Sequence, residues 1–148
     1  GQDYAFYKQF LTNKAVHFIS NKTYDLLSVA HAALVTSGTA TLETALFKVP
    51  EVVCYKGNWI SYQIAKQIIT LKYISLVNLI MDKEVVKELI QEDLTTQNLS
   101  KELKQLLEEP SRQAAIKADY TALKQALTTG RKATEVAAGI IQETLYKK

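Results

Sequence analysis

Cysteine, histidine and proline are scarce in this chain of 148 residues, and the shortage excludes several kinds of site. There are one cysteine, two histidines and two prolines. Cys54 cannot form an internal disulfide, and its apolar neighbours favour a small buried side chain. Neither His17 nor His31 has a carboxylate or thiol at metal-ligand spacing. We therefore expect neither a metal site nor a disulfide-stabilised fold.

Long hydrophobic runs and dense basic clusters are also missing. No apolar stretch approaches the roughly 20 residues that cross a bilayer, and no signal-peptide pattern opens the chain. The net charge is +3, but lysine and arginine are too dispersed to follow a phosphate backbone. The acidic segment 82–109 has helical periodicity and fits a solvated helix face. These features predict a cytoplasmic protein that does not bind nucleic acid.

Hydrophobic residues make up 47% of the chain, enough for one compact core. Four short runs are almost continuously apolar, as in strands covered on both faces of a parallel sheet. The strands are predicted at 16–19, 32–35, 52–55 and 73–77, and the helices at about 2–12, 23–30, 40–48 and 59–70. This alternation predicts an α/β fold with a Rossmann-like, doubly wound parallel sheet.

The second half of the chain is predicted to be helical. Helices are expected at 82–90, 96–108, 111–128 and 132–146, with Pro110 and Gly130 as breaks. Residues 1–109 would form the Rossmann-like part, and 110–148 the C-terminal helices of the same domain. No strand precedes the first helix, so we expect a truncated sheet whose N-terminal strand is missing.

The turn after the second predicted strand has the composition of an anion site. Gly38 allows a backbone N–H to approach a ligand closely, while Ser37, Thr39 and Thr41 supply hydroxyl groups. The following helix begins with about half a positive charge at its N-terminus, which suits a diphosphate. Glu43, one turn further on, could accept hydrogen bonds from ribose hydroxyls. Spacing alone leaves open that Ser37 or Thr39 merely caps the helix.

Four motifs occur in a characteristic order. They are Ser-Gly-Thr-Ala-x-Leu-Glu at 37–43, Pro-x-Val-Val-x-Tyr at 50–55, Asn78 after the fourth predicted strand, and Glu-Leu-Ile-Gln-Glu at 88–92. From about residue 16 to 107 the chain resembles the donor-binding part of GT-B glycosyltransferases, and more narrowly the lipid-A-disaccharide synthase family. One departure is Val77, where that family commonly has proline.

The resemblance implies a hexosyltransferase that joins UDP-2,3-diacylglucosamine to 2,3-diacylglucosamine 1-phosphate. It implies no cofactor, because such enzymes stabilise the departing UDP with helix dipoles and hydrogen-bond donors. Carried over by position, it places Ser37, Gly38 and Thr39 at the diphosphate, Glu43 at the ribose, Asn78 near the nucleotide or the transferred sugar, and Glu88 and Gln91 in the supporting wall.

The resemblance also implies partners beyond the UDP-sugar donor. The lipid acceptor and the expected catalytic acid belong to an N-terminal domain outside this sequence, so no catalytic residue is predicted here and the fragment should be inactive alone. The aromatic-rich helix at 59–70 either packs on the sheet or touches an acyl chain or the membrane surface. The protein is accordingly expected in the cytoplasm, in association with the inner face of the inner membrane. An uncovered last helix would favour a homodimer.

Two other functions fit the same residues. One keeps the fold and changes the reaction, as in a UDP-GlcNAc 2-epimerase or another UDP-sugar enzyme. The other is a non-catalytic α/β interaction module in which segment 37–43 serves only as a helix cap.

Overall fold

A computed structural model of the chain describes residues 4–11, 15–36, 38–58, 72–128 and 133–146. The chain divides into two compact units, Gly1–Ala30 and His31–Lys148. The helix predicted at 59–70 and the break at Gly130 lie outside the described residues. Within the described ranges, no helix is both long and apolar enough to cross a membrane.

The first unit contains two short helices, α1 (Tyr4–Lys8) and α2 (Thr23–Val29). The strand predicted at 16–19 is wrong, because this segment pairs with no strand in the described part of the chain. The Phe18 ring instead lies 5.2 Å from the Tyr4 ring and 5.5 Å from the Tyr7 ring, centroid to centroid. An apolar run becomes a strand only where a neighbour satisfies its backbone groups.

A three-stranded parallel sheet forms the centre of the second unit. The strands are β1 (Ala33–Thr36), β2 (Glu51–Tyr55) and β3 (Lys87–Ile90), in the order β1-β2-β3. Val35 lies opposite Val53, and Cys54 lies opposite Leu89. The predicted α/β class, a truncated Rossmann-like parallel sheet with flanking helices, is confirmed.

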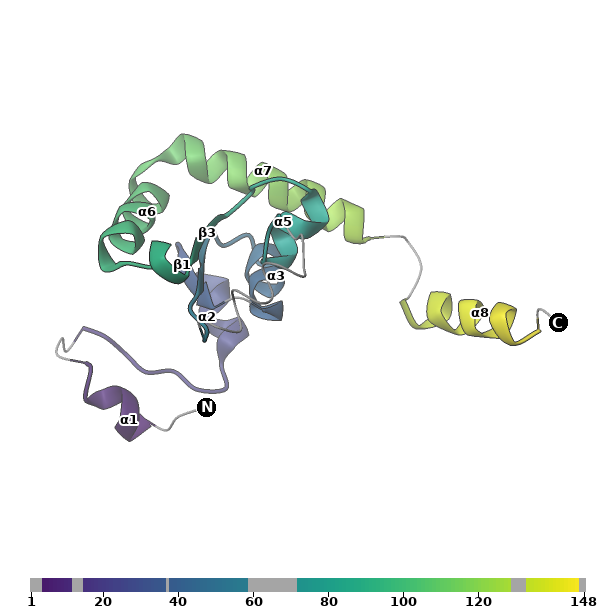
Figure 1. Cartoon of the computed structure of the whole chain (residues 1–148), viewed down its shortest axis with the longest axis horizontal. Coiled ribbons are helices and arrows are strands. Elements are labelled where there is room, and N and C mark those ends of the chain that lie inside the picture. Colours follow the sequence, from purple (N-terminus) through teal and green to yellow (C-terminus); the bar gives the residue numbers. More distant parts are fainter. Residues whose placement is uncertain (1–3, 12–14, 37, 59–71, 129–132, 147–148) are drawn as a thin grey trace. The chain divides into compact units, whose positions relative to one another are not determined.

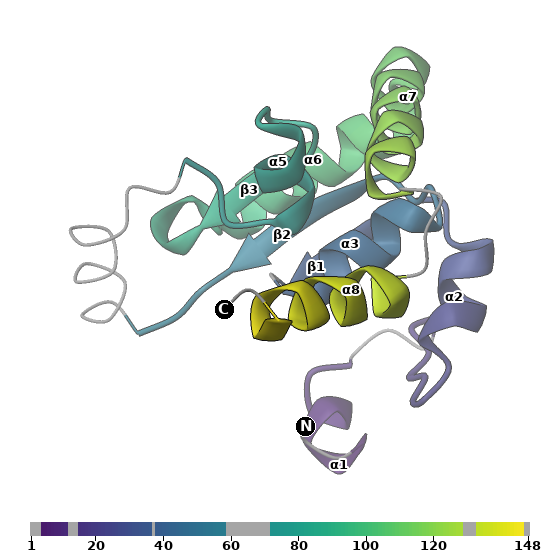
Figure 2. The ribbon, with the colours of Figure 1, turned by 90° about the vertical axis from the view of Figure 1, so that its right-hand side faces the viewer.

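Helices cover both faces of this sheet. In Figure 1 the strands lie between α6 (Thr96–Glu108) on one side and α3 (Thr39–Leu46) with α5 (Leu76–Met81) on the other, and Figure 2 gives the view at right angles. Helix α7 (Pro110–Leu127) contacts α3, α5 and α6. The shared core includes Val52, Val53, Val77, Val86, Leu106, Tyr120 and Leu123.

Helix α3 connects the first two strands, and its ends follow from the sequence. It starts after Gly38, whose φ of 143° is a backbone conformation reserved for glycine. It stops before Val49 and Pro50, because the residue before a proline is disfavoured in helical conformation. The Ala33 N–H then bonds the Pro50 carbonyl at 2.9 Å and starts the parallel ladder.

The strand predicted at 73–77 is wrong, because this segment leads into helix α5. The Ser75 hydroxyl caps that helix and accepts a hydrogen bond from the Asn78 N–H at 3.3 Å. Asp82 ends the helix in a left-handed conformation. A short apolar run flanked by a capping serine satisfies a buried helix as well as a buried strand.

The third strand comes from a segment predicted as helix, 82–90. Its apolar residues have spacing compatible with both structures, and the acidic start favoured the helix. Residues 87–90 instead pair with β2, where Val53 lies opposite Glu88. Pairing with a buried neighbour outweighs local periodicity.

The remaining helices confirm the predictions for the C-terminal half. Thr95 caps α6, and Pro110 occupies the first turn of α7, where its missing N–H costs nothing. The Arg112 guanidinium bonds Glu102 of α6 at 2.7 Å and holds the α6–α7 pair. A last helix, α8 (Ala133–Tyr146), exposes Ile140, Ile141 and Leu145. A 3-10 turn, η1 (Gln91–Asp93), follows β3 directly.

Candidate functional site

The carboxyl ends of the three parallel strands lie at one edge of the sheet. β1 leads there into Gly38 and α3, β2 into the segment 56–58, and β3 into Gln91. In an open α/β sheet this is the edge at which ligands bind, against helix N-termini. Of the predicted residues, Gly38, Thr39, Glu43 and Gln91 follow strands that end at this edge, whereas Ser37 lies outside the described residues.

The N-terminus of α3 is exposed at this edge. Gly38, Thr39 and Ala40 are all exposed, and within the described residues no side chain caps the helix. Thr39 is the first helical residue rather than its cap, so capping by Thr39 is wrong. The Thr41 N–H already donates to the Gly38 carbonyl at 3.2 Å, so the first-turn backbone donors that could serve an anion are those of Thr39 and Ala40.

Thr41 does not supply a hydroxyl to a ligand, contrary to the expectation from sequence. Its side chain is buried, and its hydroxyl donates to the Gly38 carbonyl at 2.8 Å. Thr44 behaves in the same way, donating to the Ala40 carbonyl at 2.8 Å. Both threonines therefore fix the first turn of α3 from its buried side.

Glu43 lies on the second turn of α3 and is only partly buried. No described residue forms a hydrogen bond or an ion pair with its carboxylate. A carboxylate without an internal partner has its full accepting capacity available to a ligand.

Replacing Gly38 by alanine should destabilise the chain by about 2 kcal/mol, because a side chain is strained at this φ. No heavy atom lies within 4 Å of the position that the added Cβ would take. Gly139 on α8 has the same open space without a positive φ, so Gly139→Ala should stabilise by roughly 0.5 to 1 kcal/mol. Urea denaturation of both variants measures the difference, and equal effects would contradict a backbone cause.

Gln91 joins the ends of β2 and β3. Its side-chain amide oxygen accepts a hydrogen bond from the Gly57 N–H at 3.3 Å, while its side-chain amide nitrogen has no partner among the described residues. The residue is 5% exposed and has a φ of 51°. An unpaired buried donor costs about 1–3 kcal/mol, and a left-handed non-glycine residue adds about 1–2 kcal/mol. Such accumulated cost is typical of functional positions.

Gly57 was not singled out by the sequence as part of the site. If position 57 carried a side chain, its Cβ would lie 2.8 Å from the Tyr55 hydroxyl oxygen. Glycine at this position therefore allows the Tyr55 side chain to lie against the backbone. A glycine two residues after the end of β2 was the available signal.

Asn78 is fully buried, and its side-chain amide is used inside the protein. Its oxygen accepts from the N–H groups of Val85 and Val86 at 2.8 and 3.0 Å. Its nitrogen donates to the Val86 carbonyl at 2.8 Å and to Glu88 at 2.9 Å. Asn78 therefore joins α5 to the turn before β3.

Glu88 completes this connection from β3. Its two carboxylate oxygens accept from the N–H groups of Ile74 and Ser75, each at 2.9 Å. These donors precede α5, so the carboxylate lies where the helix dipole favours a negative charge. Asn78 and Glu88 are thus brought together by a direct hydrogen bond, as structural supports of the segment that enters α5.

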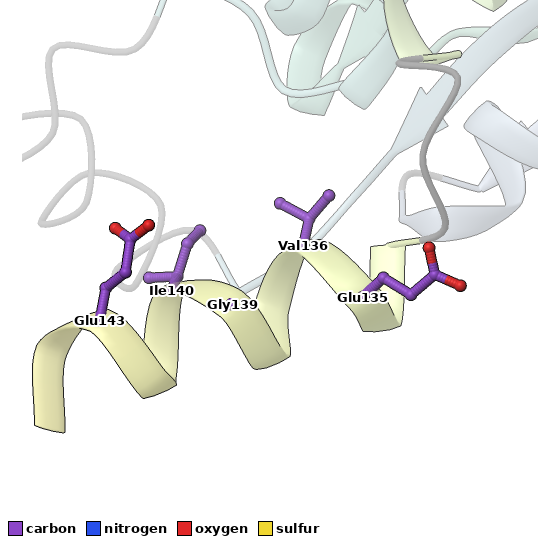
Figure 3. Close-up of a pocket in the computed structure, with 5 residues that line it drawn as sticks. All are labelled: Glu135, Val136, Gly139, Ile140 and Glu143. Atoms are coloured by element: carbon purple, nitrogen blue, oxygen red, sulfur yellow. The ribbon is translucent and has the colours of Figure 1, made fainter. Parts of the chain in front are cut away.

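The pockets lined by described residues lie away from this edge of the sheet. Figure 3 shows one along α8, where Val136, Ile140 and Glu143 project from one side of the helix. A second, of about 260 Å³, lies between the start of β3 and α7, lined by Lys87, Arg112 and Asp119 among others. The charged groups that line this second pocket already form ion pairs with neighbouring side chains. Among the described residues, no cluster of carboxylate, thiol or imidazole groups is placed to hold a metal ion.

The fold is that of a Rossmann-like α/β domain, and the carboxyl ends of its strands form the edge at which sheets of this kind bind ligands. The family model described as lipid-A-disaccharide synthetase matches residues 3–141. The chain belongs to that family.

Curated relatives support the same assignment. The chain is 38% identical over 133 residues to the lipid-A-disaccharide synthase of Syntrophus aciditrophicus, covering 90% of this chain and 34% of the relative. It is 42% identical over 106 residues to that of Psychromonas ingrahamii, covering 72% and 28%. For Geobacter sulfurreducens the values are 35% over 128 residues, 86% and 33%. The chain thus spans about a third of the length of these relatives.

Proposed function

We propose that the chain is the UDP-sugar-binding part of a hexosyltransferase of lipid A biosynthesis. The complete enzyme would join UDP-2,3-diacylglucosamine to 2,3-diacylglucosamine 1-phosphate and release UDP. The acceptor and the catalytic acid would be bound and supplied by the part of the protein outside this chain. Family membership supports the reaction class.

One observation carries the proposal for the donor site. The α3 N-terminus is exposed beside Gly38, and one turn later follows the Glu43 carboxylate, which has no partner among the described residues. First-turn N–H groups would bind the diphosphate, and Glu43 would accept hydrogen bonds from the ribose hydroxyls. Ser37 and Thr39 would add hydroxyl donors. The same helix N-terminus would stabilise the charge that develops on the departing UDP.

The predicted wall residues would act indirectly. The side chains of Asn78 and Glu88 form hydrogen bonds with each other and with backbone groups next to α5 and β3. We therefore assign them the support of the donor cleft, so that their loss would alter its shape.

Location and assembly belong to the same proposal. The enzyme would act in the cytoplasm at the inner face of the inner membrane, where its acylated substrates reside. The exposed apolar residues of α8 would be covered by the acceptor-binding part of the enzyme or by a second copy in a homodimer.

Replacing Glu43 by alanine in the full-length enzyme should lower kcat/KM by about 100-fold, because hydrogen bonds to a charged acceptor contribute about 1.5–3 kcal/mol. UDP affinity, measured by isothermal titration calorimetry, should fall in parallel. The fold should persist, because no described residue depends on this carboxylate.

Glu108→Ala is the matched control for Glu43→Ala. Glu108 also lies on a helix, and it forms only an exposed ion pair with Lys104 at 3.7 Å, a kind of pair that contributes little. Unchanged kinetics and UDP affinity in Glu43→Ala would refute the site and favour the interaction module. UDP binding with activity towards UDP-GlcNAc alone would favour the epimerase.

A further inference from the structure

We infer that Gln91 recognises the sugar of the nucleotide-sugar, by donating a hydrogen bond from its side-chain amide to a sugar oxygen. This inference rests on the proposed function and deepens it. It assigns the sugar to one end of the site and the nucleotide to the other.

The side chain is oriented by the hydrogen bond it already makes. Only the carbonyl oxygen of a carboxamide accepts, so the Gly57 N–H fixes which end of the Gln91 amide faces the β2 side. The amide nitrogen then points away from Gly57. It is covered by the protein, yet no described residue accepts a hydrogen bond from it. An acceptor is therefore missing at the ligand-binding edge.

Backbone geometry agrees with a role in binding. Gln91 follows the last residue of β3 directly and has a φ of 51°, which side chains other than glycine and asparagine rarely adopt. The left-handed conformation turns the chain sharply at the carboxyl end of the strand. A strained backbone and an unpaired buried amide at one residue are hard to explain by packing alone.

Position along the edge indicates which part of the ligand is involved. The α3 N-terminus and Glu43 belong to the β1 end of the edge, whereas Gln91 follows β3, with β2 between them. Two interstrand spacings separate these ends by about 10 Å. If diphosphate and ribose occupy the α3 side, the group left to face β3 is the transferred sugar. Its hydroxyl and acyl carbonyl oxygens are acceptors of the required kind.

Two variants separate recognition from a purely structural link between β2 and β3. Gln91→Glu keeps an oxygen for the Gly57 N–H and replaces the donor, whereas Gln91→Met removes both. Full-length enzyme is titrated calorimetrically at about pH 8 with UDP, and with UDP-2,3-diacylglucosamine in detergent micelles. Gln125→Glu, on the exposed end of α7, controls for the added charge.

Both Gln91 variants should bind UDP within about threefold of wild type and the UDP-sugar about tenfold more weakly, the size of one good hydrogen bond. Gln125→Glu should leave both affinities unchanged. A structural link alone predicts normal binding by Gln91→Glu and an equal loss of both ligands in Gln91→Met, and either result would overturn the inference. Wild-type enzyme that binds neither ligand would instead refute the proposed function.

Discussion

Asn78→Ala is expected to lower the free energy of unfolding by about 4 kcal/mol, since each buried group that loses its partner costs about 1–3 kcal/mol. The substitution leaves the N–H groups of Val85 and Val86 and the Val86 carbonyl without the amide that now satisfies them. Urea denaturation followed by circular dichroism measures the loss.

A second variant tests whether the donor end of Asn78 matters by itself. Asn78→Asp keeps the shape and the acceptor oxygen, but it places a second oxygen against the Val86 carbonyl and the Glu88 carboxylate. It should therefore be about as destabilising as alanine, because a buried charge beside another carboxylate is unfavourable. Asn98→Ala is the control, since its amide bonds only the Asp93 carbonyl near the surface. Equal stability of the two Asn78 variants and this control would contradict the assignment.

Glu51→Gln should remove a pH dependence of stability worth about 3 kcal/mol between pH 4.5 and pH 7. Glu51 begins β2, is 0% exposed and faces Tyr120 of α7. Burial raises the pKa of its carboxyl from 4.5 to about 9, although the Tyr120 hydroxyl opposes the shift. Burial also raises the pKa of the Tyr120 hydroxyl, so both groups are neutral at pH 7.

The sign of the effect follows from proton uptake. Between pH 4.5 and about pH 9 the folded protein holds a proton on Glu51 that the unfolded chain has released. The free energy of unfolding contributed by this residue therefore falls by about 1.4 kcal/mol per pH unit in that window and levels off above it. Below pH 4.5 both states are protonated and the contribution is constant.

Urea midpoints of wild type and Glu51→Gln at about pH 5, 6, 7 and 8 isolate this residue, because the other titrating groups are common to both proteins. The difference in stability should grow with pH in favour of glutamine. A constant difference would show that Glu51 is ionised in the folded protein. Glu51 lies at the amino end of its strand, opposite the candidate site, so UDP affinity should not follow the same pH dependence.

Local sequence was sufficient wherever one chemical feature decided the structure. Gly38 is the residue that permits the backbone conformation before α3, and Pro50 prevents the helix from continuing. The strands before and after α3 were also placed correctly, because each is a short apolar run bounded by residues that end it. The part of the candidate site on α3 could accordingly be predicted as a strand, a glycine turn and a helix start.

Segments whose apolar spacing fits two structures were assigned wrongly. Residues 73–77 were predicted as a strand but lead into helix α5, and residues 82–90 were predicted as a helix but contain strand β3. Residues 16–19 were predicted as a strand but pair with no strand in the described part of the chain. Contacts with other parts of the chain decide between helix and strand in these segments. Asn78 and Glu88 form a hydrogen bond across the turn between α5 and β3, and Lys87–Ile90 pair with strand β2. The hydrogen bonds that Asn78 and Glu88 make inside the protein were for the same reason invisible in the sequence. So was the Gln91 amide nitrogen, which has no acceptor among the described residues.

The amino-acid sequence by itself determined the α/β class, the family resemblance and the turn at Gly38, because glycine, proline and ordered motifs act through the covalent chain. Only the tertiary structure decided which apolar segment became the third strand, which polar groups are consumed internally and which remain open to a ligand. These outcomes depend on hydrogen bonds between residues that are not neighbours in the sequence. Burial sets the free-energy cost of each polar group that is left without a partner.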